Sequence, residues 1–550
     1  MTMNSETPAT RRRDALVIAA SSLGTVFEWY DFYLYGLLAA IIAEQFFAGA
    51  SPSSAFIFAL IAFAAGFAVR PFGALVFGRL GDLVGRKYTF LITMGLMGLS
   101  TFLVGLLPTY ASIGMTAPLL LLALRLVQGL ALGGEYGGAA TYVAEHAPDH
   151  RRGLYTSFIQ TTATLGLFAA LLVVIVTRTA LGPEDFAAWG WRIPFLVSAI
   201  LLAISMWIRM QLAESPAFVR MKEEGTRSKA PIREAFGRWS NLKIVLIALF
   251  GAVAGQAVVW YAGQFYALFF LERVLKVEAG SANIMVAIAL ALATPFFIIF
   301  GALSDRIGRK PIILAGLLLA ALTYVPLFKA LTVAANPALA EAQERSPVTV
   351  IADPGGCSFQ FDPVGRSKYD RRSCDVAKSF LAKAGISYSN ATAPPGSPTI
   401  VKVGDVPIEM LDVREFDGEV RALVIDAFET QARAALDVAG YPAKADGAAV
   451  NRLQVVAILF VLVIYVTMVY GPIAALLVEL FPTRIRYTAM SLPYHIGNGW
   501  FGGFLPATAF AIVAARGGIY DGLIYPIAVA GIGFVIGLLF LPETRGRSLD

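Results

Sequence analysis

The sequence predicts an all-α membrane protein with twelve transmembrane helices in two six-helix pseudo-symmetric halves, and with a small α+β module inserted outside the membrane. Composition is the first reason: 57% of the 550 residues are hydrophobic and only 15% are charged, whereas soluble domains carry about 25% charged residues. The mean hydropathy is +0.67. An internal repeat and a series of long apolar runs are the other two reasons.

The repeat is a basic turn that occurs twice. Gly78-Arg-Leu-Gly-Asp-Leu-Val-Gly-Arg-Lys87 returns as Gly301-Ala-Leu-Ser-Asp-Arg-Ile-Gly-Arg-Lys310. Each copy ends one hydrophobic run and begins the next. A turn repeated in this setting indicates two similar membrane halves in tandem.

The apolar runs give the helices in order, since a bilayer-spanning helix needs about 20 mostly apolar residues. The first half contains runs at 15–43, 53–79, 88–108, 117–144, 153–180 and 190–212. The second half contains runs at 241–271, 281–303, 311–331, 451–480, 486–515 and 521–541. The predicted domains are therefore a first half at 1–212, a linker at 213–240, a second half at 241–331 with 451–550, and an insertion at 332–450.

The first run follows Arg11-Arg12-Arg13 but contains Glu28 and Asp31 and lacks a small-residue cleavage site. It therefore predicts a first transmembrane helix and not a cleaved signal peptide.

Lysine and arginine set the expected orientation. They gather in alternate connections, such as 79–87, 220–243 and 306–310, while 44–52 and 109–116 hold almost none. By the positive-inside rule, both termini and the linker are expected in the cytoplasm, in a multi-pass protein of the inner (cytoplasmic) membrane. The net charge of +6 is thus a topology signal and does not indicate nucleic-acid binding.

The insertion at 332–450 is polar and too long for an ordinary loop. Its pattern predicts a strand at 348–352, a helix at 374–384 capped by Ser373 and ended by Gly385, two strands within 399–411, and a helix at 415–438. Helix parity places this module outside the cytoplasm.

Cys357 and Cys374 are the only cysteines, and both lie in this module. In an oxidising compartment they predict a disulfide, worth about 3 kcal/mol in the chain-entropy model. The alternative is two unpaired buried thiols.

The repeated turn also predicts a cytoplasmic gate. Its glycines let helix ends approach closely, its aspartates can cap or bridge helix termini, and its arginines can reach carboxylates on other helices. The alternative is that these charges only enforce topology. The expected members are Gly78, Asp82, Gly85, Arg86, Glu145, Arg152, Gly301, Asp305, Gly308, Arg309, Glu479 and Arg484.

Ionisable residues inside the first half are functional candidates, because an unpaired charge at mid-bilayer costs several kcal/mol. We expect Asp31, with Glu135, to carry a transported proton. Glu28 shares a helix face with Asp31; it either takes part in coupling or forms a structural ion pair with Arg70. Arg125 or Arg70 would bind a substrate carboxylate.

The second half has few charges in its spans and offers amides and aromatic rings instead, including Gln264, Tyr465, Tyr470 and His495. Such side chains suit a substrate body between the halves, although ordinary packing is the alternative for any one of them. His495 is expected to be structural. The predicted substrate-binding set is Arg70, Arg125, Gln128, Gln256, Trp260, Tyr261, Tyr494 and Asn498.

These motifs resemble a known family. The twin turn resembles the signature of the major facilitator superfamily. A narrower likeness is carried by Glu28-Trp-Tyr-Asp31, Arg70-Pro-Phe-Gly73, Arg125-Leu-Val-Gln-Gly-Leu-Ala-Leu-Gly-Gly-Glu135, Trp191-Arg-Ile-Pro-Phe195 and Pro542-Glu-Thr-Arg-Gly546. Together they are similar to the metabolite:proton symporters, which include shikimate, α-ketoglutarate and proline/betaine permeases. The resemblance covers the membrane part and leaves the insertion unexplained.

The resemblance implies a proton-coupled symporter that imports a small organic acid or zwitterion by alternating access. One alternative is a proton-coupled exporter of drugs or metabolites, and another is a transporter-like sensor whose external module binds a ligand. The similar proton-coupled sugar porters face a helix-1 aspartate with a helix-4 arginine, which supports Asp31 and Arg125. The protein is expected to be a monomer. Its expected partners are the transported molecule, protons and the lipid bilayer. No enzymatic activity, cofactor, metal ion or nucleic acid is expected.

Overall fold

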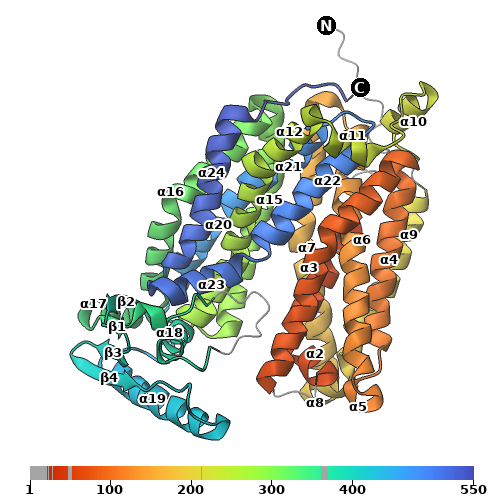
Figure 1. Cartoon of the computed structure of the whole chain (residues 1–550). Coiled ribbons are helices and arrows are strands. Elements are labelled where there is room, and N and C mark those ends of the chain that lie inside the picture. Colours follow the sequence, from red (N-terminus) through yellow and green to blue (C-terminus); the bar gives the residue numbers. More distant parts are fainter. Residues whose placement is uncertain are drawn as a thin grey trace.

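The computed structural model describes residues 22, 24–27, 29–47, 52–211, 213–360 and 369–549, without the side chains of 40 and 52–64. Two groups of long helices stand side by side, and a small sheet-containing module lies at one end of the second group (Figure 1). Glu28, which the sequence marks as a coupling residue, lies outside the described residues.

The first half consists of long helices joined by short connections. Residues 29–46 are helical apart from a turn at 38 and include α2 (Ala39–Phe46). The other long helices are α3 (Pro52–Leu83), α4 (Arg86–Leu106), α6 (Thr116–His146), α7 (Arg152–Leu181) and α9 (Arg192–Met210). The short helices α5 (Tyr110–Ile113) and α8 (Pro183–Asp185) lie between them, and the linker forms α10 (Pro216–Glu223) and α11 (Pro231–Gly237).

The second half repeats this pattern. Its first span is built from α12 (Trp239–Ala248), α13 (Ala254–Tyr261) and α14 (Ala267–Phe269), joined by π-helical turns. The remaining helices are α15 (Ala279–Ile307), α16 (Arg309–Ala335), α20 (Arg452–Tyr470), α21 (Ile473–Leu480), α22 (Arg486–Ile496), α23 (Leu505–Arg516) and α24 (Ile524–Phe540).

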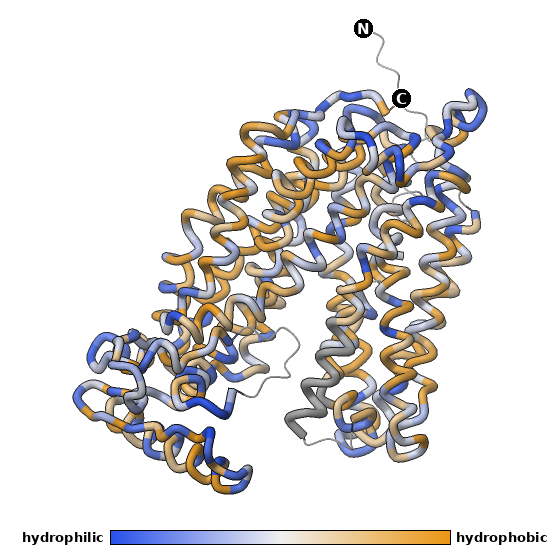
Figure 2. Tube along the Cα trace, viewed as in Figure 1, coloured by the Kyte–Doolittle hydropathy of each residue, from blue (hydrophilic) through white to orange (hydrophobic). Residues whose placement is uncertain are grey.

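Within the described residues, ten helical segments are long and apolar enough to cross a membrane. They coincide with predicted spans three to twelve, while α3 and the helical residues 29–46 occupy the first two. Figure 2 shows hydrophobic residues along these helices and hydrophilic residues at both ends. The predicted fold class, a helical membrane protein with a small mixed insertion, is confirmed.

The insertion between α16 and α20 forms a four-stranded sheet with helices. The strands are β1 (Val348–Ala352), β2 (Tyr388–Thr392), β3 (Thr399–Val403) and β4 (Val406–Met410), in the order β2-β1-β3-β4. β1 runs parallel to β2, and the other pairs are antiparallel. The helices are α17 (Pro337–Arg345), α18 (Ser373–Ala384) and α19 (Gly418–Val438).

The predicted strands and helices of the insertion are present, but α17 and β2 were not predicted and one predicted helix cap is wrong. β2 was not predicted, because only Tyr388 of its five side chains is buried and no apolar alternation marks it. The predicted cap by Ser373 is wrong: Arg372 holds the cap position without a side-chain cap bond, and the Ser373 hydroxyl bonds to that of Thr399. The predicted stop at Gly385 is confirmed, with a φ of 72°.

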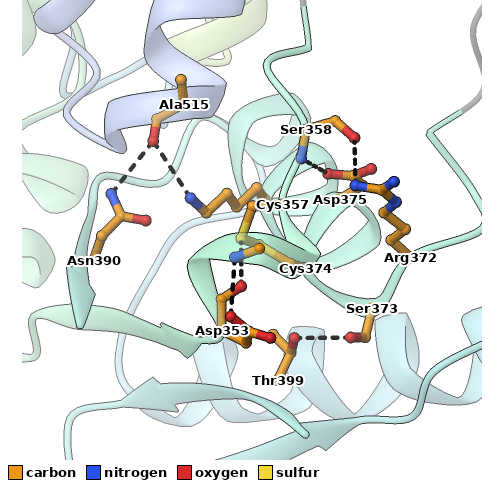
Figure 3. The surroundings of a disulfide bond; sticks show 12 residues. Asp353, Cys357, Ser358, Arg372, Ser373, Cys374, Asp375, Asn390, Thr399 and Ala515 are labelled. Atoms are coloured by element: carbon orange, nitrogen blue, oxygen red, sulfur yellow. Dashed lines mark hydrogen bonds between the residues drawn. A yellow bond between two sulfur atoms is a disulfide. The ribbon is translucent and has the colours of Figure 1, made fainter. Parts of the chain in front are cut away.

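The module is fastened to the end of α23. Lys378 Nζ donates to the Ala515 carbonyl at 3.4 Å, Asn390 Nδ2 donates to the Arg516 carbonyl at 2.7 Å, and Tyr388 Oη donates to the Ala514 carbonyl. The last carbonyls of a helix have no partner within it, so these donors complete α23. Figure 3 shows this end of α23 beside the disulfide region.

A disulfide joins Cys357 to Cys374, with Cα atoms 5.2 Å apart. Beside it, the Ser358 amide donates to Asp375 Oδ1 at 2.7 Å (Figure 3). The bond therefore fixes the segment after β1 to the first turn of α18.

Candidate functional site

A buried ion pair links the helical residues 29–46 to α6 in the first half. Arg125 Nη1 lies 3.5 Å from Asp31 Oδ2, and the two residues are 5% and 2% exposed. Gln128, one turn along α6, accepts from Arg125 at 2.7 Å and donates to Asp31 Oδ1 at 3.2 Å and to Thr101 Oγ1 at 2.9 Å. The Asp31 carboxylate is thus bound by the charge of Arg125 and by the side-chain amide of Gln128, and both residues belong to α6.

Aromatic rings contact Arg125 and a second arginine of the first half, Arg70. The Arg125 guanidinium lies 4.2 Å from the centre of the Tyr35 ring, and that of Arg70 lies 4.4 Å from the centre of the Phe67 ring. Both contacts are within cation–π range. The charge of Arg70 also acts on Asp31. Arg70 Nε has no hydrogen-bond partner among the described residues.

Glu135 does not join this cluster. Its Oε1 lies 3.3 Å from Arg209 Nη1 at the end of α9, and its Oε2 accepts from Thr93 Oγ1 of α4 at 3.2 Å. Both ionic partners are buried. Arg209 is not among the predicted site residues, although an arginine in the last turn of an apolar run was a signal for it.

Aromatic side chains join the two halves. Trp29 lies 5.2 Å from Trp260, Tyr33 stacks on Phe265 at 6.1 Å, and the Tyr136 ring stacks on Tyr494 at 3.6 Å between centres. The predicted residues Trp260 and Tyr494 therefore contact Trp29 and Tyr136, which were not among the predicted site residues.

The amides and hydroxyls of the second half bond mainly to one another. Gln256 and Asn498 exchange hydrogen bonds at 3.3 Å, and the Tyr494 and Tyr470 hydroxyls are 2.7 Å apart. Tyr261 packs edge-on against Trp260 at 4.9 Å. The buried Trp260 Nε1 has no hydrogen-bond partner among the described residues, so it can donate to a bound molecule.

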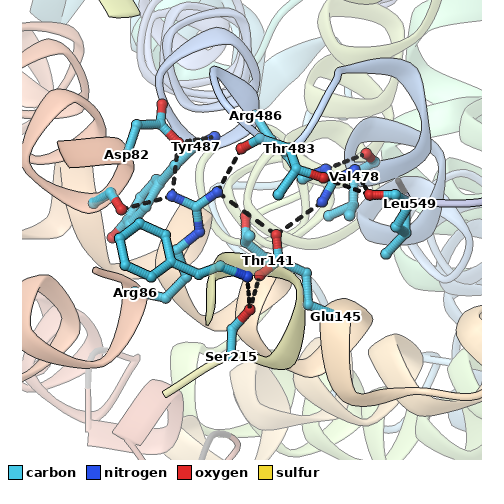
Figure 4. A network of polar contacts seen from close by, with 12 residues as sticks. Asp82, Arg86, Thr141, Glu145, Ser215, Val478, Thr483, Arg486, Tyr487 and Leu549 are labelled. Carbon is cyan, nitrogen blue, oxygen red and sulfur yellow. Dashed lines mark hydrogen bonds and ion pairs between the residues drawn. The ribbon is translucent and has the colours of Figure 1, made fainter. Parts of the chain in front are cut away.

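The first copy of the repeated turn forms ion pairs that reach the second half (Figure 4). Arg86 Nη1 lies 2.8 Å from Asp82 Oδ1, and Arg86 Nη2 lies 3.6 Å from Glu145 Oε1. Arg486 of α22 binds the same Glu145 oxygen at 2.8 Å. Asp82 also accepts from the Thr488 amide at 2.9 Å, which caps the start of α22.

The second copy of the turn, in the second half, forms the equivalent contacts with the first half. Arg309 lies 2.6 Å from Asp305 and 3.0 Å from Glu479, and Arg152 of the first half lies 2.8 Å from Glu479. Asp305 accepts from the Gly153 amide at 2.8 Å at the start of α7. Each half thus contributes one aspartate that caps a helix of the other half. Each half also contributes one glutamate that binds arginines from both halves.

The glycines of the turns permit this close approach. Gly85 and Gly308 have φ values of 140° and 108°, which side chains disfavour. A Cβ on Gly78 would lie 2.9 Å from the Thr488 Cα, and one on Gly301 would lie 2.7 Å from the Gly153 carbonyl oxygen. The predicted member Arg484 lies apart and pairs with Glu234 of the linker at 2.6 Å; Arg486 occupies the place expected for it.

We call the set Asp82, Arg86, Glu145, Arg486, Arg152, Asp305, Arg309 and Glu479 the terminal cluster. It lies at the end of the molecule where the C-terminal segment runs, because Arg486 Nη2 donates to the Leu549 carbonyl at 3.2 Å. The sheet-containing module lies at the opposite end (Figure 1).

Comparison with known proteins agrees with this architecture. The family described as "Sugar (and other) transporter" matches residues 16–234 and 433–550, and the one described as "MFS/sugar transport protein" matches residues 138–351. The structure of the proton:xylose symporter XylE bound to 6-bromo-6-deoxy-D-glucose superposes with a TM-score of 0.61 over 98% of each chain at 17% identity, which shows a shared fold.

Two curated relatives are similar over more than half of this chain. The chain is 38% identical to the proline/betaine transporter of Salmonella typhimurium over 54% of this chain and 61% of that protein. It is 36% identical to the α-ketoglutarate permease of Escherichia coli over 60% of this chain and 74% of the permease. The alignment therefore spans about three fifths of the length of the first of these relatives. With family matches over more than half of its length, the chain belongs to the sugar (and other) transporter family of the major facilitator superfamily.

Proposed function

We propose that the protein is a proton-coupled symporter that imports a small organic acid or zwitterion across the inner membrane by alternating access. The observation that carries this proposal is the buried Asp31–Arg125 pair with Gln128 bridging both groups. Protonation of Asp31 weakens its attraction to Arg125, and Arg125 is then available to the carboxylate of the cargo. A proton and an anion can thus exchange places on one arginine.

Alternating access requires a closure that forms and breaks. The terminal cluster supplies it, because Arg86–Glu145–Arg486 and Arg152–Glu479 join the halves through buried charges. We propose that this cluster is the cytoplasmic gate and that the described conformation is closed on that side. The distribution of lysine and arginine supports cytoplasmic termini and an external module.

The cargo class follows from the site and the relatives together. The names of the relatives give proline, betaine and α-ketoglutarate as cargo, all of which carry a carboxylate. Arg125 and Arg70 suit that group, while Trp29 and Trp260 suit an apolar or cationic body.

The charge of the cargo decides the driving force. One charge crossing 100 mV is worth about 2.3 kcal/mol, or nearly 50-fold accumulation. A zwitterion that enters with one proton uses this voltage, whereas a monoanion with one proton uses the pH gradient alone.

Uptake in a transport-deficient host tests the proposal. Proline, betaine and α-ketoglutarate are compared with the neutral sugar xylose at two external pH values. At least one carboxylate is expected to accumulate faster at the lower pH, and xylose is not. Asp31→Asn should abolish accumulation, while Asp405→Asn, a change at an exposed module residue, should leave it unchanged. Uptake in the Asp31→Asn variant with the same pH dependence would refute the assignment.

A further inference from the structure

One aromatic side chain of the second half is seated among glycines of the first. Tyr487, in the first turn of α22, is fully buried and lies against Gly81 of α3 and Gly137 and Gly138 of α6. A Cβ on Gly81 would overlap the ring. A Cβ on Gly137 would lie 2.9 Å from Tyr487 Cε2, and one on Gly138 would lie 2.5 Å from the hydroxyl oxygen. The seat accepts the ring only because these three residues are glycines.

Hydrogen bonds to the first half hold Tyr487 in this seat. Its hydroxyl donates to the Gly134 carbonyl of α6 at 2.5 Å, and its amide donates to Asp82 Oδ1 of α3 at 3.3 Å. Figure 4 shows Tyr487 beside Asp82, at the edge of the terminal cluster. Every one of these contacts crosses between the halves, so all are lost when the halves separate at this end.

Behind the seat lies the Glu135–Arg209 ion pair. The Arg209 guanidinium lies 3.4 Å from the centre of the Phe90 ring. Phe90 and the Tyr487 hydroxyl both approach the same point, since a Cβ on Gly138 would be 3.2 Å from Phe90 Cδ2 and 2.5 Å from Tyr487 Oη. Phe90 therefore connects the seat to Arg209, which in turn pairs with Glu135 within the first half.

We propose that Tyr487 is a positioning residue for the transport cycle, a plug that seals the Glu135–Arg209 pair from the terminal passage. In the closed state the ring fills the glycine seat, and water cannot reach Glu135 from this end. When the halves separate, Tyr487 leaves with α22 and the pair becomes accessible from this side alone. The role of Glu135 in proton coupling depends on the proposed symport, but the seal itself does not.

A cysteine reporter measures the seal directly. Both native cysteines are in the disulfide, so Thr93→Cys provides a single free thiol at a position that bonds Glu135 at 3.2 Å. Labelling by a membrane-impermeant maleimide is followed in everted vesicles, in which the proposed cytoplasmic side faces the reagent. The labelling needs neither cargo nor a proton gradient. It therefore tests the seal independently of the proposed proton transport.

The variants separate the seat from general packing. Gly138→Ala overfills the seat, and Tyr487→Ala empties it; each is expected to raise the labelling rate of the reporter about tenfold. Gly95→Ala is the matched control, because a Cβ on that glycine meets nothing within 4 Å, and its rate should equal that of the reporter alone.

Two results would overturn the proposal. One is a labelling rate for Gly138→Ala and Tyr487→Ala within twofold of the Gly95→Ala rate. The other is an equal rise when the reagent is applied from the opposite face, since general loosening of the fold gives that result and a one-sided plug does not.

Discussion

Replacing Glu479 by glutamine should open the terminal end of the molecule. Glu479 lies on α21 of the second half, and its buried carboxylate binds Arg152 of the first half at 2.8 Å and Arg309 of its own half at 3.0 Å. Glutamine keeps the shape of the side chain and removes its charge. Arg152 then loses this partner only in the closed state, in which the halves touch. Arg309 loses it in both states, because it belongs to the same half as Glu479.

The magnitude follows from the contacts that remain. Breaking a buried ion pair by removing one partner costs about 3–5 kcal/mol. Arg309 keeps Asp305 at 2.6 Å, and Arg152 keeps its ion pair with Asp149 and its hydrogen bond to the Arg547 carbonyl at 3.1 Å, so the low end, about 3 kcal/mol, applies. Since 1.4 kcal/mol is tenfold in an equilibrium constant, the population should shift roughly 100-fold toward the open state.

Labelling of a cysteine at the interface measures this shift. Ser157 of α7 is buried against Gly301 of α15, so Ser157→Cys is covered only while the halves touch. The control is Glu341→Gln, because the Glu341–Arg345 pair is 72% and 61% exposed and exposed pairs are worth about 0–1 kcal/mol. Equal labelling rates in the Glu479→Gln and Glu341→Gln backgrounds would refute the reasoning.

Three further predictions concern the module and the linker. Gly385→Ala should lower the melting temperature more than Gly396→Ala, because both have positive φ but only a Cβ on Gly385 meets neighbouring backbone. Cys357→Ser should make the module sensitive to proteolysis, with a loss of about 3 kcal/mol for its loop of 17 residues. Partial burial raises the pKa of Glu234, but hydrogen bonds from Ser228 and Arg484 outweigh it and lower that pKa; the stabilisation is therefore present above the ordinary glutamate pKa and is lost as the pH falls below it. Glu234→Gln should cost less than about 1 kcal/mol at neutral pH and nothing in acid, as melting curves at both pH values would report.

The repeated turn let the sequence predict most of the terminal cluster. Two aligned copies identify Arg86 and Arg309 as equivalent residues, and each then needs a carboxylate from another helix end. The contacts expected with Glu145 and Glu479 are present at 3.6 Å and 3.0 Å. Ionisable residues in apolar runs likewise marked Asp31 and Arg125, because an unpaired charge at mid-bilayer costs several kcal/mol.

What the sequence did not yield depends on helix rotation and on contacts between halves. Arg484 and Arg486 are two residues apart, and only the start of α22 decides that Arg486 faces Glu145. Arg209 resembles a topology signal at a helix end, and only the packing of α9 beside α4 brings it to Glu135 of α6. Tyr487 carries no local pattern, since its seat is made by glycines more than 300 positions away in the chain.

Proton movement driven by cargo is the direct sign of the proposed symport. Purified protein is reconstituted in liposomes that contain a pH-sensitive dye, and a carboxylate identified by the uptake assay is added outside without an imposed pH gradient. The lumen should become acidic as cargo enters, and Asp31→Asn should remove this signal. Cargo entry at the normal rate with no change in internal pH would contradict the proposed symport.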